Sequence, residues 1–108
     1  MQTEKILLTA TVLAAAALTA KRFVSFAGGQ AVATDVALGV ANASYDAGEQ
    51  AGVDTHGEIL VEAGAAITVG AQVQPDASGR AIPLAAGTAF GRARDAAAAA
   101  GDFIRVLR

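Results

Sequence analysis

The chain has 108 residues, and its 8 Lys and Arg against 10 Asp and Glu give a formal net charge of −2 at pH 7. This slight acidic surplus argues against a nucleic-acid binder, which needs basic residues to displace the counterions of phosphates. The absence of cysteine excludes disulfides, thiolate metal sites and thiol catalysis. Hydrophobic residues make up 54% of the chain, but about half of them are alanine. Alanine removes little area from water, so we expect a thin core that gains stability by association.

An apolar run covers residues 6–20, preceded by Lys5 and followed by Lys21. It is shorter than the roughly 20 residues that a membrane-spanning helix needs. Apolar residues and threonines alternate in its first half, which predicts an extended arm and first strand. The alternative is a secretory signal peptide with Lys5 as its positive region, which would make the chain a secreted or periplasmic small β-domain. We expect residues 1–20 to form an N-terminal arm and first strand, and residues 21–108 to form a single compact β domain.

Glycine and turn residues divide the rest of the chain into short alternating segments. Residues 28 and 29 are both glycine and predict a tight hairpin. Pro83 lacks a ladder donor, so the segment that contains it is expected at a sheet edge. The expected strands cover residues 22–26, 30–34, 37–41, 50–54, 57–62, 67–69, 70–74, 80–84, 89–94 and 102–107.

Residues 95–100 are an Asp followed by five alanines, with Gly101 behind them. An Asp at the N-cap position and a Gly at the end predict one short helical turn near residues 95–100. The remaining pattern is that of many short strands. We therefore expect a mainly β fold, a small antiparallel β-barrel or sandwich of jelly-roll type with an extended N-terminal arm.

Residues that could carry chemistry are few. His56 is the only histidine, and a small hydrolase that uses it with a nearby carboxylate is the weaker alternative. Glu58 and Glu62 would share one face of a strand, which is typical of a solvated face rather than of an acid/base pair. No phosphate-binding loop is present. We predict no catalytic, cofactor-binding or metal-binding residues, no enzymatic activity, and no nucleic-acid or membrane partner.

Arginines recur at alternate positions of two C-terminal segments, at Arg92, Arg94 and Arg105. Pairs of Arg94 with Asp95 and of Arg105 with Asp102 would be ordinary surface ion pairs. The other interpretation is that these arginines dock onto an acidic partner.

Several blocks of the sequence, in their order, resemble the small capsid cement, or decoration, proteins of tailed bacteriophages. The blocks are residues 22–24, 37–41, 46–50, 57–64 and 91–107. The resemblance covers most of the chain, roughly residues 6–107. It implies a β-rich structural protein, made in the host cytoplasm, that sits on the outer surface of the phage head. It also implies a homotrimer, with a homodimer as the alternative, that bridges neighbouring copies of the major capsid protein.

The apolar start then corresponds to the family's N-terminal arm and first strand. Such a segment can add a strand to an exposed sheet edge of a capsid subunit, with backbone hydrogen bonds supplying affinity. The predicted capsid-contact residues are Lys5, Ile6, Leu7, Leu8 and Val12. Phe90, Phe103 and Ile104 are candidates for the core or for the interface between subunits.

Overall fold

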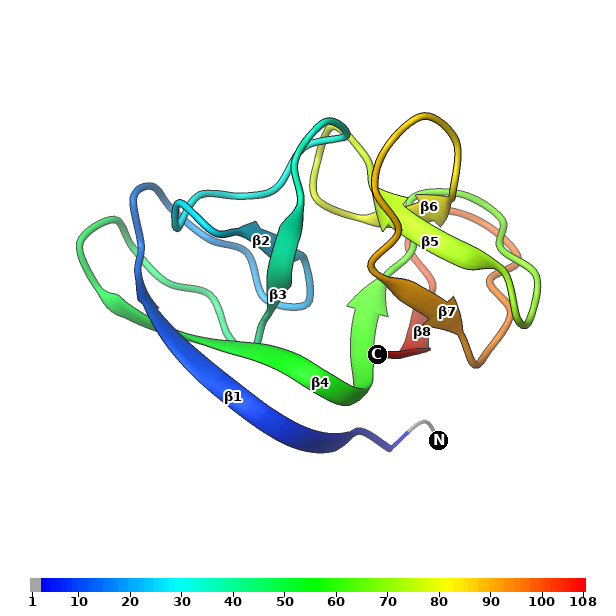
Figure 1. Ribbon diagram of the computed structural model, residues 1–108, viewed down its shortest axis with the longest axis horizontal. Coiled ribbons are helices and arrows are strands. Elements are labelled where there is room, and N and C mark those ends of the chain that lie inside the picture. The colour runs from blue at the N-terminus through cyan, green and yellow to red at the C-terminus, as the bar shows by residue number, and fades with distance from the viewer. Residues whose placement is uncertain (1–2) are drawn as a thin grey trace.

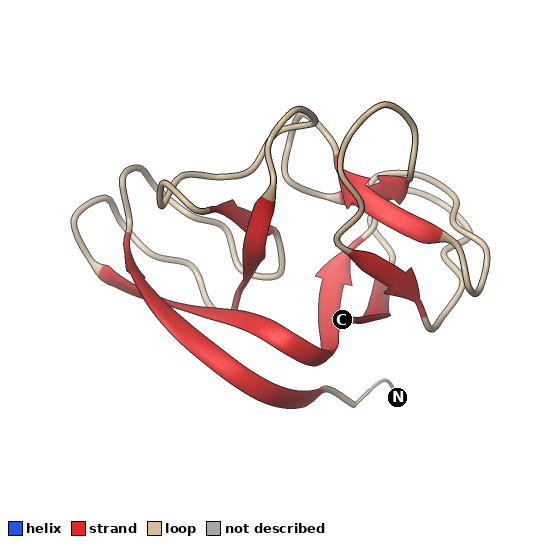
Figure 2. Cartoon of the chain, viewed as in Figure 1, coloured by secondary structure: helices blue, strands red, loops and turns tan. Residues whose placement is uncertain are grey.

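The structure, a computed structural model, describes residues 3–108 and contains only strands as regular elements in that range (Figures 1 and 2). The strands are β1 (Lys5–Leu13), β2 (Phe23–Ser25), β3 (Ala37–Ala41), β4 (Gln50–Glu62), β5 (Gln72–Pro75), β6 (Ala81–Pro83), β7 (Gly91–Ala93) and β8 (Phe103–Leu107). The two expected strands over 50–54 and 57–62 are one continuous strand. The expected strands over 30–34 and 67–69 are reduced to isolated bridges. Residues 1 and 2 of the expected arm lie outside the described residues. No helix in the described part is long and apolar enough to cross a membrane.

All eight strands belong to one antiparallel sheet in the order β2-β3-β4-β8-β7-β5-β6, and β1 pairs with the remaining edge of β4. The sheet curls into a nearly closed barrel, which confirms the mainly β, barrel-like fold. The strand that ends at Pro83 lies at the end of this order, where a residue without an N–H donor is tolerated.

Strand β4 is the longest strand and joins the two halves of the molecule. Its first half lies between β1 and β3, and its second half pairs with β8. The change of partner occurs at Gly57, whose φ of 118° is accessible to glycine and strained for other residues. The backbone of Gly57 exchanges hydrogen bonds with Arg108 at 3.1 and 3.3 Å. β4 therefore bends at this glycine and carries β1 around the outside of the fold (Figure 1).

The core consists of two hydrophobic clusters, one on each side of this bend. The larger one is built from fully buried side chains of β2, β4, β5 and β8, including Phe23, Ile59, Val73 and Ile104. The smaller one lies under the first half of β4 and contains Leu18 and Val53. Alanines fill much of the remaining space in both clusters, as the composition predicts. Ile59 and Val61 are buried while Glu58 and Glu62 face outward, in agreement with the alternation of the sequence.

The helical turn predicted for residues 95–100 is wrong. These residues form bends, and Ala97 is buried and pairs with Ile67 through two backbone hydrogen bonds of 2.9 and 3.0 Å. Asp95 does not cap a helix, because its carboxylate accepts two hydrogen bonds of 2.8 Å from the guanidinium of Arg105. Tertiary pairing overrides the helical propensity of five alanines, since so short a helix gains little by itself.

Candidate functional site

Strand β1 is an edge strand whose outer side is open. It pairs with β4 along nearly its whole length, and no other described backbone group hydrogen-bonds to residues 5–13. In Figure 1 it runs along the lower border of the molecule and crosses β4 near its end. Proteins usually protect such an edge with charges, prolines or bulges, because its free N–H and C=O groups invite another strand. β1 carries Lys5 and an irregularity near Leu8, but its register from Thr9 to Leu13 is continuous and carries neither charge nor proline.

The pairing pattern shows which backbone groups of β1 are free. Thr11 lies opposite Gly52, and the carbonyl of Gly52 accepts a hydrogen bond of 3.1 Å from the N–H of Asn42 on its other side. In an antiparallel ladder both polar groups of a residue point the same way, so Thr11 directs its N–H and C=O away from β4. Thr9 and Leu13, two positions away in the same register, share this direction. The N–H and C=O groups of Thr9 and Thr11 therefore face outward without a strand beside them. At Leu13 the backbone of Gly28 covers the carbonyl, since a Cβ on Gly28 would lie 2.3 Å from that oxygen.

The structure divides the predicted capsid-contact residues into two groups. Ile6 and Val12 are partly buried and pack against the larger and the smaller core cluster, respectively. Lys5, Leu7 and Leu8 face solvent, and the two leucines are 82% and 53% exposed. Ile6 and Val12 therefore fix β1 to the core, and Lys5, Leu7 and Leu8 lie on the solvent side near its open edge.

Lys5 and Leu7 also line an open pocket of about 390 Å³ between the start of β1 and the end of β8. Its other lining residues are Gly57, Glu58, Leu107 and Arg108. The carboxylate of Glu58 is engaged by Arg94, so this ion pair replaces the predicted pair of Arg94 with Asp95. The pocket therefore has apolar leucine walls, and the basic residues Lys5 and Arg108 are among its lining residues.

Arg108 is fixed against the fold by its own side chain. Its guanidinium lies 4.5 Å from the ring centroid of Phe90 and donates a 2.7 Å hydrogen bond to the carbonyl of Leu38. Burial lowers the pKa of this guanidinium from its usual value, because desolvation disfavours the charged form. Sequence reasoning missed this residue, since nothing in the sequence brings positions 38, 90 and 108 together.

The three candidates for an oligomer interface occupy different environments. Ile104 is fully buried in the larger cluster, and Phe90 is buried with its ring 4.9 Å from that of Phe23. Phe103, at the start of β8, is 44% exposed. Only Phe103 of the three presents a surface to a partner.

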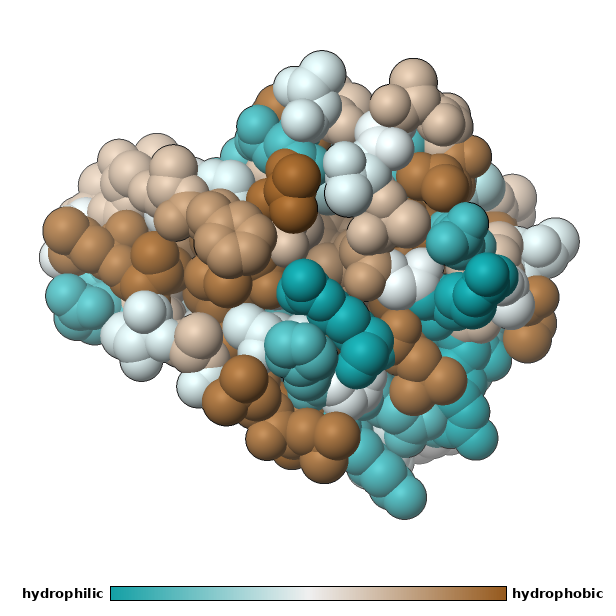
Figure 3. All heavy atoms as spheres, viewed as in Figure 1, coloured by the Kyte–Doolittle hydropathy of each residue, from teal (hydrophilic) through white to brown (hydrophobic). Residues whose placement is uncertain are grey.

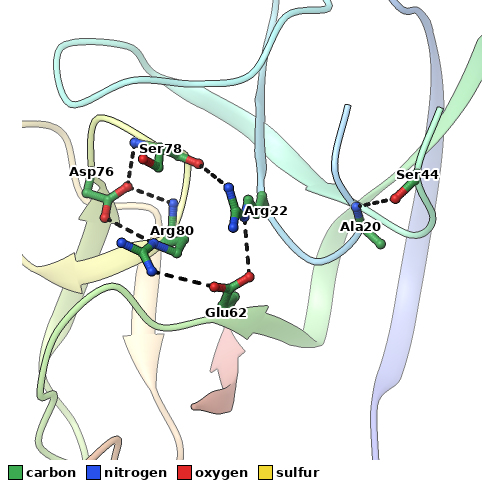
Figure 4. A network of polar contacts seen from close by, with 7 residues as sticks. All are labelled: Ala20, Arg22, Ser44, Glu62, Asp76, Ser78 and Arg80. Carbon is green, nitrogen blue, oxygen red and sulfur yellow. Dashed lines mark hydrogen bonds and ion pairs between the residues drawn. The ribbon is translucent and has the colours of Figure 1, made fainter. Parts of the chain in front are cut away.

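Two groups of polar contacts hold β1 and the turn after β5 in place. The carboxylate of Glu4 accepts hydrogen bonds from the backbone N–H of Leu60, at 2.8 Å, and from the ammonium of Lys21, at 3.1 Å. Glu62 lies between the guanidinium groups of Arg22, at 3.3 Å, and Arg80, at 3.6 Å (Figure 4). The first group anchors the N-terminal segment to the second half of β4, and the second anchors Arg22 and the turn after β5 to the same part of β4. Sequence reasoning missed them because the partners are far apart in the chain.

Asp54 is a buried residue of β4 and lies between Thr9 of β1 and Val40 of β3. It accepts a 2.9 Å hydrogen bond from the hydroxyl of Thr9 on β1. Burial raises the pKa of Asp54, and the hydrogen bond from Thr9 opposes this rise; Glu4 adds to it and Lys21 reduces it. The contribution of Asp54 to the stability of the fold, where β1 pairs with β4, therefore depends on pH.

No arrangement typical of catalysis or metal binding occurs in residues 3–108. His56 is exposed and contacts the hydroxyl of the neighbouring Thr55 at 3.1 Å. The carboxylates of Glu58 and Glu62 are each engaged by arginine. No group of three potential metal ligands exists within this range.

Comparison with known proteins agrees with a role in phage heads. The family model described as "Phage cement protein" matches residues 1–108. The fold is similar to the crystal structure of the head fiber gp8.5 N base of bacteriophage phi29, with a TM-score of 0.75 and 24% identity over 94% of this chain and 93% of that chain. No curated protein matches.

The chain therefore belongs to the class of β-barrel structural proteins of phage heads. It is a member of the phage cement protein family.

Proposed function

We propose that the chain is a decoration protein that binds the outer surface of a phage head and stabilises contacts between major capsid proteins. Membership of the cement family supports the role in the virion. The observation that carries the mode of binding is the open edge of β1, with the outward N–H and C=O pairs of Thr9 and Thr11 beside the exposed Leu8. An extended segment of the capsid protein adds to this edge as a further antiparallel or parallel strand.

This binding mode suits a shell that repeats one junction many times. Backbone hydrogen bonds to a strand edge are modest individually, but copies that are joined to one another bind with much higher avidity. We propose that the decoration protein acts as a homo-oligomer, a trimer in preference to a dimer, and that no catalytic step is involved. It is made in the host cytoplasm and joins the head there.

A proline at position 11 tests the proposed edge. Thr11→Pro removes one outward N–H and places a ring where the added strand would lie, while the bonds between β1 and β4 stay intact. We expect at least about tenfold weaker binding to heads that lack the protein, from the lost hydrogen bond and the blocked edge.

Thr11→Val is the matched control, because it keeps the N–H and the branched shape. It should bind like the unmodified chain, and thermal unfolding of both variants checks that the fold persists. If Thr11→Pro folds and decorates heads as well as Thr11→Val does, the capsid contact lies elsewhere.

A further inference from the structure

The far end of β1 forms an apolar tip that carries no basic residue. It consists of three adjacent segments, residues 13–18, 25–28 and 45–49. The N–H of Ala15 donates to the carbonyl of Gly28 at 3.1 Å, and the N–H of Gly48 donates to the carbonyl of Ala14 at 2.8 Å. Phe26, in the turn closed by Gly28, is 61% exposed, and Leu13 is 56% exposed. Figure 3 shows apolar side chains gathered at the end of the molecule where β1 finishes.

Charged residues of opposite sign that form no ion pair within the described part of the chain lie at the two ends of β1. Five of the eight basic residues form ion pairs within residues 3–108. Of the three basic residues outside these pairs, Lys5 and Arg108 line the pocket at the start of β1, and Arg92 donates a hydrogen bond of 3.0 Å to the carbonyl of Gly70. The charged residues of the tip are Asp46 and Glu49, and neither forms an ion pair with a described residue. The tip is therefore apolar with an acidic border, and the pocket is apolar with a basic border.

These two surfaces cannot meet within one molecule. They lie at opposite ends of a nine-residue strand, about 26 Å apart at the usual rise per residue. Two tips cannot face each other favourably either, because their carboxylates would come together. The tip of one copy and the pocket of another complement each other in both hydrophobicity and charge.

We propose that copies of the chain associate head to tail, with Phe26 of one copy inserted between Leu7 and Leu107 of the next. A pocket of about 390 Å³ accommodates one aromatic ring, and a buried aromatic anchor is a frequent source of interface energy. Asp46 and Glu49 then lie near Lys5 and Arg108 of the neighbouring copy. A contact between two different surfaces generates a ring when its rotation closes. This inference deepens the self-association within the proposed function, and it is testable without capsids.

Cysteine pairing tests the geometry, because the chain has no cysteine of its own. A mixture of one preparation with Phe26→Cys and another with Leu7→Cys should form a disulfide-linked heterodimer under mild oxidation. We expect this product at least about tenfold faster than a homodimer of either variant, since only the mixed pair is held together in the interface. Equal rates for all three pairings, or a faster Phe26→Cys homodimer, would overturn the head-to-tail arrangement.

Sedimentation of the full chain gives an independent readout. Phe26→Ser should weaken association about tenfold to a hundredfold, the loss expected for one buried aromatic side chain. The control Val69→Ser removes a similarly exposed apolar side chain elsewhere and should change nothing. Lys5→Glu and Asp46→Lys should each weaken association, and the double variant should recover it.

A monomeric unmodified chain at its highest soluble concentration would refute the inference. So would a double charge variant that fails to recover association although it is folded. Neither result would affect capsid binding through the edge of β1, which Thr11→Pro tests separately.

Discussion

Gly57→Ala tests the bend that carries β1 around the fold. A Cβ at this position would lie 2.2 Å from the carbonyl oxygen of Lys5 and 2.9 Å from the amide nitrogen of Leu7. Both atoms belong to backbone, so β1 or β4 must shift. The φ of 118° adds strain for any residue with a side chain.

The expected loss follows from these two costs. The disfavoured φ costs about 1–3 kcal/mol, and relief of the overlap costs about 1–3 kcal/mol more. The sum of about 4 kcal/mol is a large fraction of the 5–15 kcal/mol that stabilises a typical domain. For a chain of this size it corresponds to a fall in Tm of roughly 15 °C.

Gly48→Ala is the control, because Gly48 has a φ of 89° but nothing within 4 Å of the added Cβ. It should show only the backbone cost. Urea unfolding gives the two free energies, and hydrogen exchange at residues 5–8 should accelerate only in Gly57→Ala. Equal losses in the two variants, with unchanged exchange in β1, would refute the close packing of β1 on the bend.

Two further changes test the buried charges. The raised pKa of Asp54 means that its carboxylate destabilises the fold at pH 7, a penalty that disappears as the pH falls through the folded pKa towards the ordinary value of 3.8. Asp54→Asn keeps an acceptor for Thr9 and removes the buried charge, so it should raise the unfolding free energy at pH 7. The variant should lose this advantage in acid. If denaturant unfolding at a series of pH values gives the same difference in unfolding free energy between the variant and the unmodified chain, the explanation is wrong. Glu62→Ala leaves two guanidinium groups without their shared carboxylate and should cost about 1–3 kcal/mol. The more exposed Arg94→Ala should cost less than about 1 kcal/mol in the same measurement, and equal losses would argue against a special role for Glu62.

The sequence predicts the strand character of this chain well, because burial follows the two-residue period. Ile59 and Val61 point inward and Glu58 outward as the alternation requires, and Pro83 lies at an edge. The sequence pattern predicts a separate strand that starts at Gly57. Gly57 is instead a bend within one strand, because a glycine with positive φ can continue pairing on both sides.

The candidate site was predictable only in part. The alternation within residues 6–12 identifies a strand, but it puts Leu8 on the same face as Ile6 and Val12. The register irregularities on both sides of Leu8 turn this side chain outward, where it is 53% exposed. The alternation also does not identify β4 as the partner. The pocket is lined by Lys5 and Leu7 together with Leu107 and Arg108, which lie about a hundred positions later in the chain. Such a neighbourhood depends on the topology of the whole sheet and is not visible in the sequence. The ion pair of Arg105 with Asp95, rather than with Asp102, likewise depends on how β8 meets the loop before it.

The most direct test of the proposed function is a reconstruction of the virion at a resolution that traces strands. We predict density for this chain on the outer surface of the head, with an extended segment of the capsid protein alongside Thr9 and Thr11 of β1. Density that places β1 away from the shell, or heads that contain none of the chain, would contradict it.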